Sequence, residues 1–503
     1  MRGRPPNIVF IITDQQSANM MSCTGNPYVR TPNMDYIAQN GVRFTNAYCA
    51  NPVCQPSRFS LMTGLYPSAG GLSGDGKFLP DTVMPPCIPE NALGAVLKRQ
   101  GYEAVYGGKQ GIPGLDATGL GFDYFYADER EGLADGCADY IHQRRDGKPF
   151  AMVASFINPH DICLMAIDDF AELADNDADK RIVRQCEYEI NSVRQAAKLP
   201  EGMHRDVFFD TICPPLPLNH LPPADEPGAI GILLRERGFR QLARERYTAE
   251  QWRLHRWAFA KLTETVDAQV GKVINSLIEN ELWDNTVVIL TSDHGDMDAS
   301  HKMEHKSAFY QECVKVPLLL KGVKGGYGAD KTTANGPFCD AAENTGHRTN
   351  DALVSNGLDG DTAKSTGHGT NDAPVFDGLD GNTAKSTGLK TNDALVSNGL
   401  DSICTILDYA GAAKPAYMPG ISLRPYLEDG APPPRKYLIV EGELGCMAAD
   451  KRHKYVRYND GVNNEQFYDL VINSGEQYNQ IDDVRYADKL QKLKNAVENH
   501  TGK

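Results

Sequence analysis

The chain has 503 residues, more than one ordinary hydrophobic core accommodates, so we expect two domains. Its apolar fraction of 41% and mean hydropathy of -0.43 are typical of a soluble globular protein. No apolar run approaches the roughly 18 residues that a membrane-spanning helix needs. The net charge of -15 argues against a nucleic-acid partner, and it means that local positive charge must attract any anionic substrate.

The first predicted element is a buried strand over residues 8–13. A secretory signal peptide is the alternative interpretation, but the apolar run is short and no small-residue cleavage site follows it. The 12 cysteines have no paired C-x-x-C spacing, which is typical of reduced, mostly buried thiols in a cytosolic protein. We therefore expect a cytoplasmic protein, or a periplasmic or secreted one if an export signal has been removed.

Further along the chain, short β-branched runs alternate with amphipathic segments. The runs predicted to be strands cover residues 151–157, 286–291 and 314–320. Apolar residues at helical spacing predict a helix across residues 257–277. This alternation predicts an α/β fold, with a large, mainly parallel or mixed sheet between two layers of helices. Function in such sheets lies at the carboxyl ends of the strands, and Asp14, His160 and Asp293 each follow a predicted strand.

A tandem repeat interrupts the second half of the chain. The sequence T-N-D-A begins at Thr349, Thr370 and Thr391, a spacing of 21 residues. Such a period can indicate a solenoid, but a solenoid needs at least three stacking units, and here only two full copies and a partial third exist. We favour a duplication in which the third copy belongs to the fold, because it leads into a predicted helix at residues 403–410. The surplus, about residues 345–390, is then a mobile insertion.

After Pro415 the chain changes character. Short strands separated by turns are predicted over residues 436–441, 454–458 and 466–470, followed by a helix over residues 486–500. This pattern predicts two domains: an N-terminal α/β domain of residues 1–415 and a C-terminal α+β subdomain of residues 416–503 with a small antiparallel sheet.

The most informative stretch is residues 54–58, which read C-Q-P-S-R and precede Thr63-Gly64 and Tyr66-Pro67. It resembles the modification signature of the type I sulfatases, in which this cysteine is oxidised to formylglycine, whose hydrated aldehyde is the nucleophile. The resemblance extends over roughly two-thirds of the chain, which implies the alkaline-phosphatase-like fold. The other matching segments are residues 7–15, 32–35, 41–48, 283–296, 316–318, 455–458 and 468–470.

The resemblance implies a metal site. Carried over residue by residue, Asp14, Gln15, Asp293 and His294 would hold one divalent ion, with the modified Cys54 completing the ligand set. Oxygen-rich ligands suit a hard ion, so calcium is expected, with magnesium and manganese as alternatives. Taken alone, each motif would indicate only a polar turn after a strand. Gln15 replaces the second aspartate of the commoner family opening, so the site carries one negative charge fewer.

The resemblance also implies catalytic cations. Arg58, one helical turn after Cys54, would support the aldehyde hydrate with a fork of fixed donors. Lys109, His160 and Lys306 would bind the sulfate oxygens and protonate the departing alcohol. Each of these side chains, taken singly, would be interpreted as an ordinary solvated one.

One histidine of the family pattern is missing. The family usually has G-K-x-H at the Lys109 segment, where the histidine assists collapse of the sulfated hemiacetal, and Gly111 stands there in this chain. His301 lies where related sequences often have a histidine and could take over this role, which makes it a candidate catalytic residue. The alternative is that His301 or His305 is simply a polar loop residue.

Together these features predict a hydrolase that releases inorganic sulfate from an organic sulfate monoester, matured by a formylglycine-generating enzyme. A sulfated carbohydrate is the expected substrate, because the long segment 164–250 could shape a pocket for a sugar. One alternative is a phosphonate or phosphate ester hydrolase with the same fold. Another is a catalytically idle binding protein for sulfated ligands. The oligomeric state stays open.

Overall fold

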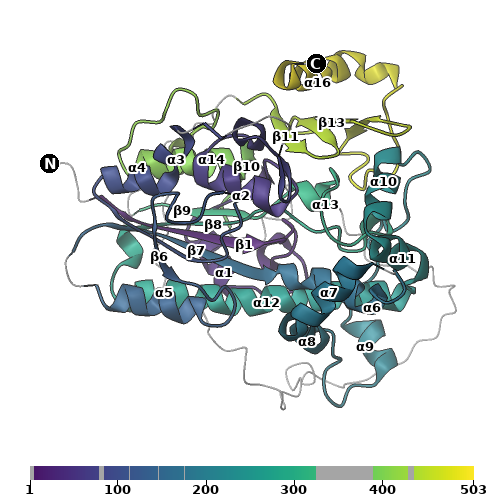
Figure 1. The fold of residues 1–503 in the computed structure, drawn as a ribbon, viewed down its shortest axis with the longest axis horizontal. Helices are drawn as coiled ribbons and strands as arrows, with labels where there is room; N and C mark the ends of the chain where they lie inside the picture. Colours follow the sequence, from purple (N-terminus) through teal and green to yellow (C-terminus); the bar gives the residue numbers. More distant parts are fainter. Residues whose placement is uncertain are drawn as a thin grey trace, which may run out of the picture.

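The computed structural model describes residues 5–78, 84–85, 87–112, 114–144, 147–174, 176–323, 389–428 and 435–502. An eight-stranded sheet forms the centre of the molecule, in the order β10-β2-β9-β8-β1-β7-β5-β6 (Figure 1). Its strands are β1 (Asn7–Asp14), β2 (Val42–Tyr48), β5 (Glu103–Gly108), β6 (Asp123–Tyr126), β7 (Phe150–Pro159), β8 (Thr286–Ser292), β9 (Leu318–Lys321) and β10 (Thr391–Ser397). Only β9 runs antiparallel to its neighbours.

The central strands are apolar because helices cover both faces of the sheet. Every residue of β1 is buried, as expected of a strand inside a doubly covered parallel sheet. In β1, Thr13 is in register with Ser292 of β8, and Asp14 is in register with Pro159 of β7. The carboxyl ends of these three strands therefore meet at one edge of the sheet. The polar residues predicted at strand ends, Asp14, His160 and Asp293, belong to this edge.

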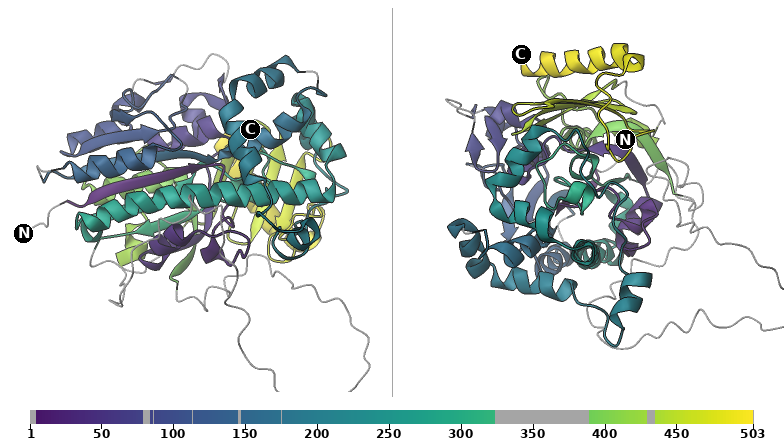
Figure 2. Two further views of the ribbon diagram at one scale, coloured as in Figure 1. Left: turned by 90° about the horizontal axis from the view of Figure 1, so that it is seen from below. Right: turned by 90° about the vertical axis from the view of Figure 1, so that its right-hand side faces the viewer.

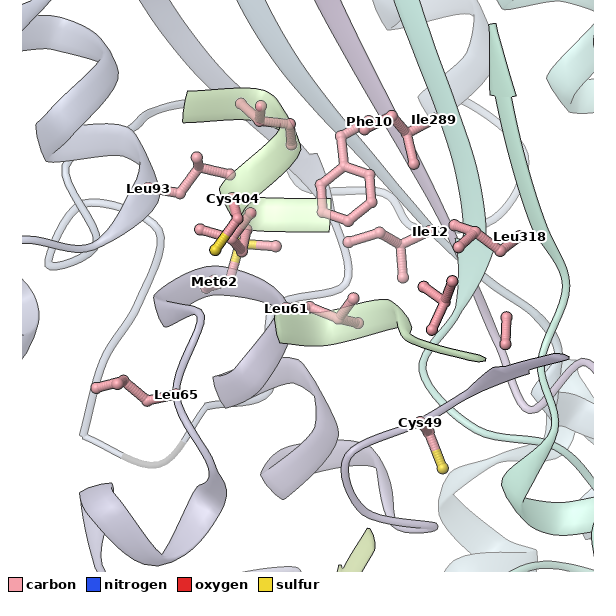
Figure 3. Close-up of a cluster of buried hydrophobic side chains, with 14 of the residues drawn as sticks. Phe10, Ile12, Cys49, Leu61, Met62, Leu65, Leu93, Ile289, Leu318 and Cys404 are labelled. Carbon is pink, nitrogen blue, oxygen red and sulfur yellow. The ribbon is translucent and has the colours of Figure 1, made fainter. Parts of the chain in front are cut away.

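Helices pack on both faces of the sheet (Figures 1 and 2). Helices α1 (Pro32–Gln39), α5 (Leu133–His142) and α12 (Ala249–Glu279) cover one face. Helices α2 (Cys54–Thr63), α4 (Leu93–Arg99) and α14 (Asn398–Tyr409) cover the other. Figure 3 shows this second layer, where Leu61 and Met62 of α2 and Cys404 of α14 lie over Phe10 and Ile289 of the sheet. This core fixes α2 against the sheet and so fixes its first residue, Cys54.

A group of shorter helices packs beside one end of α12. They are α6 (Leu164–Phe170), α7 (Asp177–Gln185), α8 (Glu187–Ala196), α9 (Arg205–Thr211), α10 (Gly228–Glu236) and α11 (Gly238–Arg246). Their apolar sides pack together and on the beginning of α12, where Trp252 and Phe259 are buried. Thr248 begins α12 with a capping box to Gln251, a motif that satisfies two otherwise unpaired backbone N–H groups.

The C-terminal residues form a four-stranded antiparallel sheet of β11 (Leu438–Gly442), β12 (Gly445–Ala449), β13 (His453–Tyr458) and β14 (Glu465–Asp469), covered by α16 (Ala487–Thr501) (Figure 2). The buried side chain of Lys454 pairs with Glu476 and donates to the Phe309 carbonyl at 2.7 Å. Glu476 also accepts a 2.7 Å bond from the Gln311 backbone N–H. These contacts tie the small sheet to the loop that follows β8.

The remaining short elements complete the chain. They are β3 (Leu72–Gly74), β4 (Lys77–Phe78), α3 (Cys87–Glu90), α13 (Gln311–Val314), α15 (Arg424–Glu428) and the 3-10 turns Ser22–Thr24, Pro67–Gly70, His160–Cys163, Trp283–Asn285, Ser300–Lys302 and Val484–Tyr486. Across the described ranges, no helix is both long and apolar enough to cross a membrane.

The predicted fold class is confirmed, and some details differ. The strand predicted over residues 314–320 begins only at Leu318, because Gln311–Val314 forms a helical turn. Strand β12 was not predicted, because its small residues lack a β-branched run. The third repeat copy forms β10, which pairs with β2, and the start of α14. The predicted insertion at residues 345–390 lies outside the described residues except for its end, and the division at residue 415 stays a prediction.

Candidate active site

Two aspartates meet where β1 and β8 end. Asp14 is the last residue of β1, Asp293 directly follows β8, and both are fully buried. Arg58, which is 1% exposed, lies between them and donates from Nη2 to Asp14 Oδ2 and from Nε to Asp293 Oδ2, both at 2.9 Å. Its Nη1 donates to Ser155 Oγ at 2.7 Å. The planar guanidinium thus fixes two carboxylates and a hydroxyl from three strands, as only a forked donor can.

Cys54 begins α2 and faces these carboxylates. Its Sγ lies 3.6 Å from Asp14 Oδ1, 3.1 Å from His294 Nε2 and 2.7 Å from Lys306 Nζ. One ligand atom from each of Asp14, Cys54, Asp293 and His294 lies within 4.8 Å of the others. Burial and the charge of Asp14 raise the pKa of the Cys54 thiol to about 12. An activated cysteine nucleophile has a lowered pKa, so the unmodified thiol does not fit that role.

Gln15 offers an oxygen to the same cluster. Its backbone N–H donates to Asp293 Oδ1 at 3.1 Å, and its Nε2 donates to Asp296 Oδ2 at 2.6 Å. The Oε1 of Gln15 is buried and has no hydrogen-bond partner among the described residues. Since a buried acceptor without a partner is rare and unfavourable, this oxygen fits a metal ligand.

The charges of the cluster also fit a cation. Burial would raise the pKa of Asp14, but the positive charges of Lys109 and Arg58 hold it well below its usual value. Burial and the negative charge of Asp14 raise the pKa of Asp293 to about 7. Burial and the charge of Lys306 lower the pKa of His294 to about 3, so its ring is neutral, as a metal-bound imidazole must be. Two carboxylates, an amide oxygen and an imidazole form a donor set for a hard divalent ion.

Three more predicted residues surround Cys54. Lys109 Nζ lies 2.5 Å from Asp14 Oδ2, and Lys306 Nζ contacts Cys54 as described above. Burial would lower the pKa of Lys306, but neighbouring acidic groups, Asp14 and Asp75 among them, raise it, so the amine stays protonated. His160 begins the turn after β7, where burial and the charges of Lys109 and Lys306 lower its pKa well below the usual value. An anion entering this group would meet two ammonium groups and a polar ring.

His301 is the predicted residue that the structure does not bring to Cys54. Its ring stacks on Tyr310 with centroids 4.0 Å apart, and its Nδ1 lies 3.4 Å from Gln477 Nε2. Burial and the charge of Lys454 lower its pKa to about 3. These contacts direct the side chain toward the C-terminal sheet.

Gly111 lies at the site without contributing a side chain. It has a φ of +82°, and a Cβ added there would lie 3.7 Å from Arg58 Cδ. A histidine at this position would therefore lie beside Arg58, but with a backbone conformation that favours glycine. The side chain that the family usually supplies here has no equivalent at the same backbone position.

Sequence reasoning missed three residues of the site. Ser155 holds Arg58, and nothing in the buried strand β7 distinguishes it. Asp296 holds the amide of Gln15, and its place three residues after Asp293 is a signal that could have found it. His305 was considered only as a loop residue, yet burial and the charges of Arg240, Lys306 and His160 lower its pKa well below the usual value. His305 therefore lies near the cations of the site.

Comparisons with known proteins agree with this geometry. The family model for sulfatases matches residues 6–332. An uncharacterized sulfatase of Escherichia coli (strain K12) is 28% identical over 364 residues, which are 64% of this chain and 63% of that protein. A Delta 4,5-hexuronate-2-O-sulfatase of Bacteroides thetaiotaomicron is 25% identical over 504 residues, 96% of this chain and 86% of that protein.

The fold is shared with solved structures. A 2-O GAG sulfatase aligns with a TM-score of 0.69 and 23% sequence identity, covering 99% of this chain and 92% of the other. The family match spans more than half of the chain and includes every residue of the cluster around Cys54. The chain belongs to the sulfatase family.

Proposed function

We propose that this sulfatase releases inorganic sulfate from a sulfated carbohydrate, with formylglycine made from Cys54 as the nucleophile and one divalent metal ion, calcium, as its cofactor. The observation that carries the proposal is the position of Cys54. Its side chain lies at the start of α2 among two carboxylates, a neutral imidazole and the ammonium of Lys306. A site of this kind combines a nucleophile with the positive charge that a sulfate ester requires.

The metal would be held by Asp14, Gln15 through Oε1, Asp293 and His294, together with the residue made from Cys54. When bound, the ion neutralises negative charge on the sulfate oxygens and on the nucleophile. The unpartnered Gln15 Oε1 and the raised pKa of Asp293 support this assignment, because both are unfavourable features that a cation would relieve.

The remaining groups would act on the sulfate and on the departing alcohol. Lys306 and Lys109 would stabilise the negative oxygens, and Arg58 would keep Asp14 and Asp293 in place. His160 is neutral in the free protein, but the charge of a bound sulfate ester favours its protonated form. His160 would then donate this proton to the oxygen of the leaving alcohol as the sulfur–oxygen bond breaks.

A sulfated sugar is the substrate that we propose. The relative that aligns with 96% of the chain is a Delta 4,5-hexuronate-2-O-sulfatase, and the solved 2-O GAG sulfatase shares the fold over nearly the whole length. The turn that begins with His160 leads into α6, and the ring of Phe239 in α11 lies 5.2 Å from the ring of His305, so helices of this segment reach the edge of the site. This segment could provide the contacts that select a sugar.

The experiment that tests the proposal has two parts. Protein is produced with a formylglycine-generating enzyme, and the tryptic peptide of residues 44–58 is examined by mass spectrometry. Hydrolysis is then measured with sulfate and phosphonate esters of the same reporter alcohol. We expect an aldehyde at position 54 and preferential release of sulfate.

Two variants complete this test. Cys54→Ala should abolish turnover, whereas Cys49→Ala, which removes the other buried cysteine of the same peptide, should retain it. An unmodified thiol in an active preparation would overturn the formylglycine mechanism. Preferential cleavage of the phosphonate ester would instead favour the phosphonate hydrolase.

A further inference from the structure

Helix α11 brings an arginine to the edge of the site. The buried ring of Phe239 lies 5.2 Å, centroid to centroid, from the ring of His305. The guanidinium carbon of Arg240 lies 5.9 Å from the centre of the same Phe239 ring. His305 is the neighbour of Lys306, whose Nζ contacts Cys54 at 2.7 Å. Arg240 is therefore next to the cations that surround Cys54.

The pKa of His305 also indicates that Arg240 lies near the cations around Cys54. After burial, the positive charge of Arg240 is the largest cause of the lowered pKa of His305, followed by Lys306 and His160. Cys163, three residues after His160, is among the groups that affect the pKa of the Arg240 guanidinium. Arg240 thus lies close to both polypeptide segments that carry the sulfate-binding cations.

Arg240 lacks the counter-ion that its neighbours have. On the same helix Arg244 pairs with Glu226 at 2.6 Å, and just before the helix Arg237 pairs with buried Asp179. Arg240 forms no ion pair with any acid in the described part of the chain, and its Nε is buried without a hydrogen-bond partner. Within the described residues, its guanidinium makes a single hydrogen bond, a long one of 3.4 Å from Nη1 to the Leu233 carbonyl.

Arg240 is half-buried and lacks a counter-ion among the described residues, so its guanidinium can pair with an anion that enters the neighbouring site. The alternative is an ordinary arginine that packs its stem on Phe239 and leaves its head in water. The buried, unpartnered Nε argues against that alternative, because a solvated head would satisfy it.

We propose that Arg240 binds a second anionic group of the substrate, a carboxylate or a further sulfate, on the same sugar that carries the reacting sulfate. This inference rests on the proposed function and narrows its substrate to sugars with two negative groups. A guanidinium binds either group through two parallel hydrogen bonds, so both sources share one chemistry. The lysines and His160 would hold the reacting sulfate while Arg240 fixes the orientation of the ring.

The test compares three sugars that carry sulfate on the same hydroxyl: a neutral hexose sulfate, a hexuronate sulfate and a hexose disulfate. Sulfate release is measured for the wild type, Arg240→Gln and Arg246→Gln. Arg246 lies on the same helix, is exposed and forms no ion pair among the described residues, so its substitution is a matched control. We expect Arg240→Gln to lose about tenfold or more in kcat/KM on a dianionic sugar beyond its loss on the neutral one.

The pattern of loss identifies the anion. A selective loss on the uronate indicates a carboxylate, and a selective loss on the disulfate indicates a sulfate. Equal losses on all three sugars, or no loss, would overturn the inference while leaving the proposed function intact.

A wild-type protein that releases no sulfate from any sugar would instead contradict the proposed function. In that case the same comparison is made by calorimetric binding to Cys54→Ala protein. There Arg240→Gln should raise the Kd of the dianionic sugar about tenfold relative to the neutral one. An unchanged ratio of these constants would overturn the inference.

Discussion

Replacing Arg58 by methionine tests whether the site is built around opposed charges. The side chain is 1% exposed and forms two ion pairs of 2.9 Å, one with Asp14 and one with Asp293. It also donates to Ser155 Oγ at 2.7 Å. Methionine fills much of the same volume but leaves two buried carboxylates without their shared cation.

The expected loss of stability follows from these contacts. Breaking a buried ion pair by removing one partner costs roughly 3–5 kcal/mol, because the remaining charge is buried and uncompensated. Asp293 limits the loss by taking up a proton, since its pKa is about 7 even with Arg58 present and rises further without it. A raised pKa in the folded state means that the folded protein binds more protons than the unfolded chain. The deficit of Arg58→Met should therefore grow as the pH rises from 5 toward 8.

The assay is thermal unfolding in a chelator and in millimolar calcium. In the chelator at pH 7.5 we expect the unfolding midpoint to fall by about 3–5 °C, because the unfolding entropy of a chain of this length is about 1 kcal/mol per kelvin. Calcium should raise the midpoint of the variant more than that of the wild type, because it supplies the missing positive charge. Arg194→Met is the control: its bidentate pair with Asp168 is exposed, so it should change stability by less than about 1 kcal/mol. Equal midpoints for Arg58→Met and wild type in the chelator would refute the reasoning.

Three further predictions concern the metal and the histidines. The affinity for calcium should fall by up to about tenfold per pH unit below pH 7, because Asp293, whose pKa is about 7, binds the ion only when ionised. A constant affinity from pH 5.5 to 8, measured by calorimetry, would contradict this prediction. Gln15→Glu keeps the shape of the side chain but places a second carboxyl group 2.6 Å from Asp296, so the two carboxyl groups should share one proton at neutral pH. At pH 8 this variant should bind calcium about tenfold more tightly than the wild type does. An unchanged affinity would show that residue 15 does not face the ion. His160→Ala should lower kcat by at least about 100-fold. His301→Ala removes a ring that stacks on Tyr310, so it should lower the unfolding midpoint and change kcat by less than about threefold. Equal losses of kcat in the two variants would indicate that His301 is a catalytic residue.

The central part of the fold was predictable because buried strands consist of apolar residues, which are visible in the sequence. β1, β7 and β8 are buried along their whole length and appear in the sequence as short apolar runs. The 31-residue helix α12 shows its apolar face at helical spacing. β10 was harder to foresee, because its partner β2 lies about 350 residues earlier in the chain, and no local pattern specifies that pairing.

The site residues also differ in how far the sequence alone could identify them. Asp14, His160 and Asp293 follow strands, so the rule that function lies at carboxyl strand ends found them without any family knowledge. Cys54 and Arg58 were found only through the family motif, because a helix beginning with cysteine has no distinctive physical signature. Ser155 and Asp296 act through hydrogen bonds across 97 and 281 residues, and such partners depend on strand register.

The loop after β8 shows why residue spacing alone could not locate the ring of His301. Six of the ten described non-glycine residues with positive φ lie between residues 298 and 307, and both His301 and His305 are among them. Each such conformation is unfavourable by about 1–2 kcal/mol, so packing on both sides must hold the loop in this shape. One consequence is that two histidines four residues apart point to different neighbours, His301 to Tyr310 and His305 to Phe239. In an α-helix the same spacing would have put both rings on one face, so a motif distance locates a catalytic side chain only where the backbone is regular.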